Sequence, residues 1–280
     1  MTTAPATLRL SPVRRRALID ALRRGTVPEA SLGFLAVGLE RFAPVLDEEL
    51  GVLRAGGAGF KAIRGEYGSG KTFFLRWLQE RARAAGFATA EVQISETETP
   101  LHRVETVYRR AMERLATEDT STAALTAVVE RWFYTLEADV TAQGIADSEP
   151  GFEPAVVTLM EQRLAEISRE APQFSAVLRA LRAARASGDA ATAQGLMAWL
   201  SGQPNVGAPV KRAAGIKGEI DHFGALSFLR GLLTLLREAG HPGLVLVLDE
   251  VETLQRVRSD VREKSLNALR GLLDDLDAGR

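Results

Sequence analysis

An eight-residue stretch, Gly65–Thr72, constrains this chain more than any other feature, because it matches the pattern G-x4-G-K-[ST] in full. Glycines let a loop wrap closely, so that successive backbone N–H groups can face a bound phosphate. Lys71 can reach the β- and γ-phosphates of a nucleotide, and the Thr72 hydroxyl can bind Mg²⁺. The pattern predicts a phosphate-binding loop, known as a Walker A motif. Its residues are Gly65, Glu66, Tyr67, Gly68, Ser69, Gly70, Lys71 and Thr72.

The residues on either side of the loop fit this mechanism. Residues 60–64, FKAIR, predict a strand that ends at the first glycine of the loop, and residues 71–85 predict a helix that Gly86 stops. A helix that begins at the loop adds the positive end of its dipole to a phosphate site. This context disfavours the alternative, a glycine-rich turn with an incidental lysine.

An acidic pair follows the most apolar strand of the chain. Residues 244–248 read LVLVL, which is typical of a buried parallel strand, and Asp249 and Glu250 come directly after it. At the carboxyl end of a parallel strand, Asp249 would lie beside the phosphate loop and could hold Mg²⁺, as in a Walker B motif. Glu250 could polarise a water for in-line attack on the γ-phosphate, which favours hydrolysis. The alternative is an acidic pair that only ends the strand. The predicted metal ligands are Thr72 and Asp249, and the predicted catalytic residues are Lys71 and Glu250.

The order of the predicted elements indicates the fold class. Strands at 60–64, 89–95 and 244–248, separated by helices, predict an α/β chain with a parallel sheet. The connection between the second and third strands is far longer than an ordinary crossover, so we interpret it as a helical insertion. Further helices are predicted from Ser11-Pro12 to Gly25 and over 36–55, most of 101–200, 222–238 and 260–276. The predicted regions are an N-terminal helical region (1–57), a core (58–100 and 240–280) and a helical insertion (101–239).

Two basic segments leave two interpretations open. The first predicted helix carries five arginines, and the Gly/Pro-rich loop 201–218 carries Lys211, Arg212 and Lys217. Each segment is either a solvated surface or a contact, for phosphates or an acidic partner at the helix and for a double-stranded DNA backbone at the loop. The net charge of −1 argues against binding nucleic acid through bulk charge.

A polar loop follows the second predicted strand, at the edge where α/β sheets bind ligands. It contains Gln93, Ser95, Glu96, Thr97 and Glu98. One interpretation is a loop that caps the helix starting near residue 101, and the other is a site that senses the γ-phosphate or a partner. By contrast, the three tryptophans lie among apolar neighbours in helical patterns and are predicted core residues, and Asp221-His222 is predicted to start a helix.

Composition removes several other classes of protein. The chain has no cysteine, which excludes disulfides, thiolate metal sites and cysteine nucleophiles. Its three histidines lie too far apart to suggest a local metal motif. No apolar run approaches the ~20 residues of a membrane span, and the first residues lack the apolar segment of a signal peptide. A cytoplasmic location is therefore the expectation.

Gly65–Thr72 together with 244–250 resembles the AAA-type branch of P-loop ATPases. Longer stretches are similar to the P-loop ATP-binding proteins encoded in BREX phage-defence islands of bacteria. These stretches are FKAIRGEYGSGKTFFLRWLQERA, AEVQISETETPLHRVETVYRR, and WLSGQPN through to GLVLVLDEVETL. The resemblance implies a bacterial AAA-like ATPase of antiviral defence that uses ATP and Mg²⁺.

The resemblance also implies partners: other defence-island proteins and further copies of the chain, since AAA-type sites usually borrow an arginine from a neighbour. Double-stranded DNA is a further candidate partner, which the basic loop 201–218 could contact. One departure is that only one predicted helix follows Glu250, where such ATPases continue with sensor elements. We expect a fragment of a longer protein, with the arginine finger and sensors beyond residue 280. The alternative is an abbreviated domain.

Three functional hypotheses follow from these observations. The first is an ATPase that couples nucleotide state to a DNA or protein partner. The second is a nucleotide-gated scaffold that binds ATP, recruits partners and turns over little. The third is a small-molecule phosphotransferase, which Glu250 and the helical insertion disfavour.

Overall fold

The strands predicted near 89–95 and 244–248 both form, and they pair in parallel. In the computed structural model, which describes residues 10–28 and 30–277, β1 spans Ala88–Gln93 and β2 spans Leu244–Asp249. Ala88 lies opposite Leu244 and Gln93 opposite Asp249, so the carboxyl ends of the two strands meet at one edge. The parallel pairing required by the long helical connection is therefore confirmed.

The strand predicted at 60–64 does not form, and this prediction is wrong. Residues 57–66 have no regular structure, and the side chains of Phe60 and Ile63 are 55% and 38% exposed. Apolar alternation supports a strand only where a neighbouring strand supplies hydrogen bonds and a core covers one face. Within the described residues, FKAIR has neither, so it remains an extended connection. The chain is mostly helical, with a two-stranded parallel sheet.

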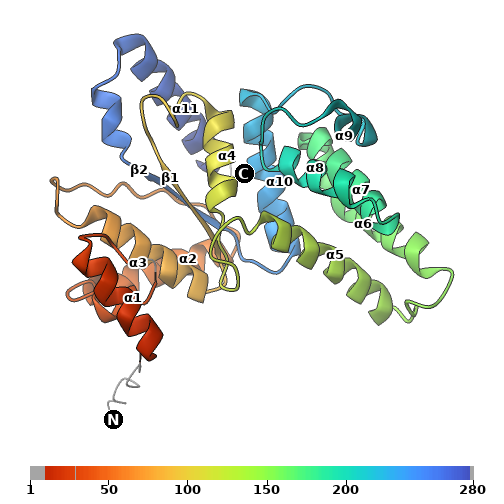
Figure 1. Ribbon diagram of the computed structural model, residues 1–280, viewed down its shortest axis with the longest axis horizontal. Helices are drawn as coiled ribbons and strands as arrows, with labels where there is room; N and C mark the ends of the chain where they lie inside the picture. The colour runs from red at the N-terminus through yellow and green to blue at the C-terminus, as the bar shows by residue number, and fades with distance from the viewer. Residues whose placement is uncertain (1–9, 29, 278–280) are drawn as a thin grey trace.

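The helices account for most of the chain and lie on both sides of the sheet (Figure 1). Those before β1 are α1 (Pro12–Arg23), η1 (Leu32–Phe34), η2 (Glu40–Phe42), α2 (Ala43–Arg54) and α3 (Lys71–Ala84). Those between the strands are α4 (Val104–Arg114), α5 (Leu125–Ala142), α6 (Phe152–Glu170), α7 (Pro172–Ala186), α8 (Ala190–Leu200), α9 (Ala208–Ala213) and α10 (His222–Glu238). Those after β2 are η3 (Val251–Gln255) and α11 (Ser259–Asp277).

Local sequence signals set several of these boundaries. The Ser11 hydroxyl accepts a hydrogen bond from the Arg14 N–H at the start of α1 (3.3 Å), and Asp221 caps α10 through the Gly224 N–H (2.8 Å). The predicted second helix is shorter than expected, because a 3₁₀ turn precedes Pro44 at the start of α2. The predicted helix-start role of Asp221 is confirmed.

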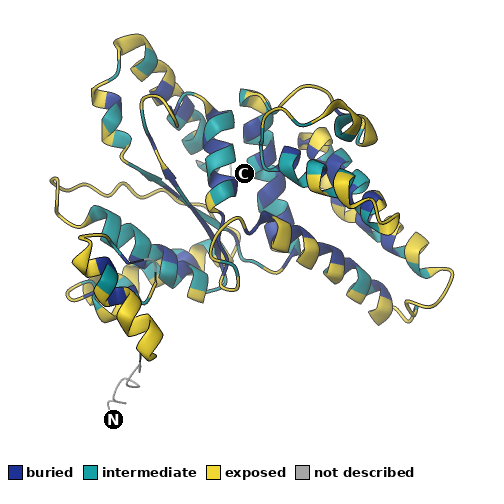
Figure 2. Ribbon diagram, in the orientation of Figure 1, coloured by how far each residue is buried: buried dark blue, intermediate teal, exposed yellow. Residues whose placement is uncertain are grey.

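A large part of the core lies where α10 meets α4, α5, α6 and α7 (Figure 2). Phe228 of α10 is 2% exposed, and its ring makes edge contacts with the rings of Tyr108, Phe174 and Trp199. This cluster is continuous with the buried face of β1. The predicted core positions of all three tryptophans, Trp77, Trp132 and Trp199, are confirmed.

Hydrogen bonds and apolar contacts join the N-terminal region to α3. The Glu80 carboxylate of α3 accepts the backbone N–H groups of Ser31 and Leu32 (2.6 and 2.7 Å), and Arg76 donates to the Val27 carbonyl (2.9 Å). Trp77 packs against Leu32 in a small separate cluster. The helix that follows the glycine-rich loop is therefore held from two sides, by the sheet and by these contacts.

Parts of the predicted regions lie outside the described residues, namely 1–9 and 29 of the N-terminal region and 278–280 of the core. Among the helices of 10–28 and 30–277, none is long and apolar enough to cross a membrane.

Candidate phosphate-binding site

The glycine-rich loop leads directly into the first turn of α3. Gly68 and Gly70 adopt left-handed conformations, with φ of 79° and 88°, which residues with a side chain rarely adopt. Gly70 is the N-cap of α3, and no side chain caps the first N–H groups of this 14-residue helix. The positive end of the helix dipole therefore lies at the loop, as an anion site requires.

The loop is folded closely on itself. A Cβ atom on Gly65 would lie 2.5 Å from the Ser69 hydroxyl oxygen, so no residue with a side chain fits there without a shift. The Ser69 N–H donates to the Glu66 carbonyl (3.2 Å), which tightens the turn. Glu66 and Tyr67, at the tip of the loop, are exposed. A side chain at the pattern's first glycine would therefore require the Ser69 hydroxyl to move.

Lys71 turns back toward the loop. Its ammonium nitrogen donates to the carbonyl oxygens of Gly65 (3.0 Å) and Glu66 (3.2 Å). Its side chain is 21% exposed, so the charge lies at the loop rather than out in solvent. A phosphate cradled by the loop amides would lie within reach of this ammonium group, which is a compact point charge.

The loop and the end of β2 come together although they are far apart in the sequence. The Thr72 hydroxyl donates to Oδ2 of Asp249 at 3.3 Å, across 177 residues. The other carboxylate oxygen of Asp249 accepts the N–H of Glu250 (2.9 Å). Both predicted metal ligands are thus in contact.

These two oxygens fit a magnesium ion. Hydroxyl and carboxylate oxygens are ligands that Mg²⁺ accepts, and adjacent ligands of an octahedral ion with bonds of about 2.1 Å lie roughly 3 Å apart. The observed separation of 3.3 Å is close to that value. Mg²⁺ keeps several waters and completes its shell with phosphate oxygens, so two protein ligands are a normal number.

Glu250 has an unusual backbone. Its φ and ψ are 57° and 31°, in the left-handed region, and its side chain is exposed. A non-glycine residue in this conformation carries local strain, and such residues concentrate at functional sites. The turn places Glu250 immediately beyond Asp249 and starts the short helix η3.

Glu252 is a member of the site that the sequence analysis missed. Its Oε1 atom lies 3.7 Å from the Lys71 ammonium nitrogen. The residue is three positions after Asp249, and the tight turn at Glu250 brings it back toward the loop. The available signal was the run DEVE at 249–252, in which three of the four residues are acidic.

The polar loop after β1 is closed by its own hydrogen bonds. The Ser95 hydroxyl accepts the N–H groups of Glu98 (3.1 Å) and Thr99 (2.9 Å), and the Ser95 N–H donates to the Thr99 carbonyl (3.1 Å). These bonds close the loop on itself. They do not involve the predicted residues of the phosphate site. The predicted capping of a helix near residue 101 is not observed, because α4 begins at Val104 and its N-cap residue, Arg103, makes no side-chain capping bond.

The basic segments are partly ordered. The loop 201–218 contains the short helix α9, and its end is fixed by Trp199, which donates to the Gly218 carbonyl (3.3 Å). Arg212 and Lys217 are exposed, as are the arginines of α1. Both segments present cationic side chains to solvent.

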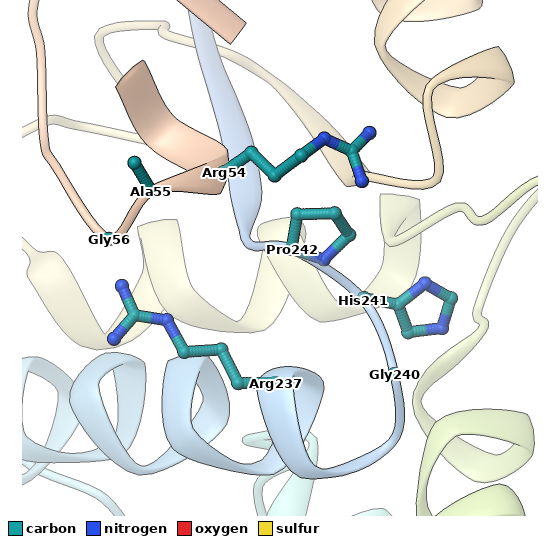
Figure 3. Close-up of a pocket in the computed structure, with 7 residues that line it drawn as sticks. All are labelled: Arg54, Ala55, Gly56, Arg237, Gly240, His241 and Pro242. Atoms are coloured by element: carbon teal, nitrogen blue, oxygen red, sulfur yellow. The ribbon is translucent and has the colours of Figure 1, made fainter. Parts of the chain in front are cut away.

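A separate cavity of about 420 Å³ lies at the opposite, amino-terminal edge of the sheet, between α2, the end of α10 and the start of β2 (Figure 3). It is lined by Arg54, Ala55, Gly56, Arg237, Gly240, His241 and Pro242. The two guanidinium groups point in different directions (Figure 3). Arg54 donates a hydrogen bond to the Ala85 carbonyl, and the carbonyl of Gly86 accepts one from Nδ1 of His241 (2.9 Å). The cavity shares no residue with the glycine-rich loop.

A glycine-rich loop at a helix N-terminus, next to a carboxylate at the end of a parallel strand, defines a candidate nucleoside-phosphate site in a chain of α/β character. The family model for the BREX system ATP-binding protein BrxC/D matches residues 10–280. The chain therefore belongs to this family of ATP-binding proteins of a phage-defence system. No curated protein and no solved structure matches the chain.

Proposed function

We propose that the chain binds ATP with Mg²⁺ at the glycine-rich loop and the end of β2, and hydrolyses it. The observation that carries this proposal is the contact between Thr72 and Asp249 at 3.3 Å. It joins the loop to the strand end, as a site needs when one metal ion must bridge the protein and the β- and γ-phosphates. We take ATP as the nucleotide because the chain belongs to a family of ATP-binding proteins.

The loop and α3 would hold the phosphates. The backbone N–H groups of Gly68, Ser69 and Gly70 would bind the β-phosphate at the positive end of α3, and the Ser69 N–H would exchange the Glu66 carbonyl for a phosphate oxygen. Lys71 would exchange its two loop carbonyls for phosphate oxygens. The ammonium group is attracted more strongly to phosphate oxygens than to carbonyl oxygens, because the phosphate carries a full negative charge.

Thr72 and Asp249 would hold the magnesium ion, which neutralises charge on the transferred phosphoryl group when bound. Glu250 would orient the attacking water. Its exposed carboxylate follows the metal ligand directly, and no side chain competes for it among the contacts of the described residues. A carboxylate in that position acts as a general base.

The proposal extends to the regions and partners. The core would comprise 58–100 and 240–280 as an AAA-like P-loop unit, with 1–57 and the helical insertion 101–239 attached to it. Nucleotide state would be coupled to other BREX proteins or to double-stranded DNA, which the exposed cations of α1 and of 201–218 could contact through phosphates. Assembly of several copies would let one copy complete the site of another.

The test is ATP turnover by the protein with and without double-stranded DNA, for the natural chain and for Glu250→Gln. We expect Glu250→Gln to lower turnover by about 10²–10⁴-fold, the usual contribution of a general base, while ATP binding remains. Glu263→Gln is the matched control, because Glu263 is an exposed glutamate on α11.

Two results would contradict parts of the proposal, and a third would identify a partner. Tight ATP binding without turnover, with or without DNA, would contradict hydrolysis and support a nucleotide-gated scaffold. Turnover that Glu250→Gln leaves unchanged would contradict the role of Glu250. Turnover that DNA raises would identify DNA as the stimulating partner.

A further inference from the structure

The Lys71 ammonium group makes two hydrogen bonds and one ion pair among the described residues. An ammonium group carries three N–H donors. Two of them face the carbonyl oxygens of Gly65 and Glu66, at 3.0 and 3.2 Å, and the Glu252 carboxylate lies at 3.7 Å. The charge that the proposed function assigns to the phosphates is therefore already paired within the protein.

Glu252 is held near Lys71 by a short, anchored turn. It lies on η3, which begins after Glu250 and is closed by the hydrogen bond from the Thr253 N–H to the Glu250 carbonyl (3.0 Å). Leu254, on the same turn, is 8% exposed and fixes the turn to the core. The backbone position of Glu252 is thus set by the same turn that places Glu250.

The Glu252 carboxylate can move away from Lys71. The Glu252 side chain is 55% exposed, so its oxygens can rotate into water without movement of η3. Pairs of this exposure are weak and are screened by salt. A triphosphate that brings several negative charges to the loop would displace the carboxylate, whereas a single phosphate brings less charge to the competition.

We propose that Glu252 is a specificity-determining residue that competes with phosphates for Lys71 and so sets a threshold of ligand charge at the loop. The proposal rests on the proposed ATP site, because it assumes that Lys71 binds the phosphates. With the site empty, Glu252 neutralises Lys71 and keeps the loop folded. Nucleotides carrying two or three phosphates overcome it, and inorganic phosphate does so poorly.

The experiment compares Glu252→Gln with the natural chain by titration with a fluorescent ATP analogue in the presence of Mg²⁺. Removal of the competing charge should tighten binding by about two- to five-fold, the range of an exposed ion pair. The inhibition constant of inorganic phosphate, obtained by competition against the analogue, should fall by at least the same factor in Glu252→Gln. Both gains should shrink at about 1 M salt, where the screening length falls to roughly 3 Å.

Glu263→Gln is again the matched control and should leave affinity unchanged, because Glu263 is exposed and makes no ion pair among the described residues. Unchanged or weaker binding by Glu252→Gln, or a gain that salt does not reduce, would overturn the proposal. Lys71→Ala separates the two claims. If Lys71→Ala binds ATP as tightly as the natural chain, the ATP site itself is wrong. If Lys71→Ala loses binding and Glu252→Gln changes nothing, only the role of Glu252 is wrong.

Discussion

The helical region around α10 and the region of the glycine-rich loop are built in different ways. Around α10, large side chains are fully buried, with Phe228 in contact with three aromatic rings. In the loop region, every residue from 54 to 70 is exposed, and the nearby strand β2 is only partly buried. The stability of the chain therefore resides mainly in the helices, and its candidate chemistry resides in a segment that contributes little to stability.

This difference predicts that substitutions will separate into two kinds. Core substitutions in the helical region should lower stability, whereas substitutions at the loop should alter ligand binding and leave stability almost unchanged. The predictions below test that separation.

The largest effect is expected in the core. Phe228→Ala removes a buried ring from the centre of three aromatic contacts and should lower the free energy of unfolding by about 3–5 kcal/mol. Phe223→Ala, on the same helix but 77% exposed, should change it by less than about 0.5 kcal/mol. Urea unfolding followed by circular dichroism measures both. Equal effects of the two substitutions would contradict the assignment of the core.

The next effect concerns ligand binding. Lys71→Ala should weaken ATP binding by roughly 10- to 100-fold, since it removes charged hydrogen bonds worth about 1.5–3 kcal/mol. The unfolding midpoint should stay the same. Lys61→Ala is the control, because Lys61 lies ten residues earlier and pairs with Glu49 at 2.7 Å. Isothermal titration calorimetry with Mg²⁺ and ATP gives the affinities, and a large loss of stability in Lys71→Ala would break the separation of the two regions.

A smaller effect is expected where Glu80 of α3 holds the N-terminal region. Glu80→Gln replaces the carboxylate that accepts the N–H groups of Ser31 and Leu32, so it should cost about 1–2 kcal/mol. Limited proteolysis should then cut the N-terminal helices earlier than in the natural chain. The exposed Glu48→Gln is the comparison, and equal cleavage rates in both variants would contradict this role of Glu80.

The smallest effect depends on pH. The hydrogen bond from Arg179 lowers the pKa of Glu161 below its usual value near 4.5. Because the pKa is lowered in the folded state, the pair stabilises the protein above pH 4.5, and this contribution is lost as the pH falls through the lowered pKa.

Glu161→Gln should therefore cost about 0.2–1 kcal/mol at pH 7, as expected for a pair that is partly exposed, and less at pH 3.5. Urea midpoints at the two pH values measure the difference. The exposed Glu166→Gln should show no such pH dependence. A cost that grows at low pH would contradict the assigned pair.

Much of this structure could be predicted from local signals. The run LVLVL predicted β2, but the burial on both faces that such a run indicates is not observed, because Val247 is the one buried residue of this strand. Ser11-Pro12 and Asp221 predicted helix starts. The serine and aspartate side chains accept N–H groups of the first turn, and proline, which has no N–H, fits the first helical position. The pattern at Gly65–Thr72 predicted which loop would precede a helix.

The remainder depended on contacts between distant residues. FKAIR is a short stretch with three apolar residues between glycines, but pairing decides whether a strand forms, and the sequence of five residues carries no information about a partner. The contact between Lys71 and Glu252 depends on the left-handed turn at Glu250. Glutamate has no preference for that conformation, so the turn could not be predicted from the residue type. The break between α6 and α7 had a signal in Pro172 that the helical periodicity of 101–200 obscured.

The central claim is that the loop and the end of β2 form one magnesium–nucleotide site. The most direct test is a double-mutant cycle with Thr72→Val and Asp249→Asn, in which ATP affinity is measured with Mg²⁺ and with EDTA, and Thr72→Ser serves as the variant that keeps the hydroxyl. The account predicts that each substitution weakens binding with Mg²⁺, that the two losses are less than additive in the double variant, and that both losses disappear in EDTA. Additive losses, or losses of the same size in EDTA, would contradict it.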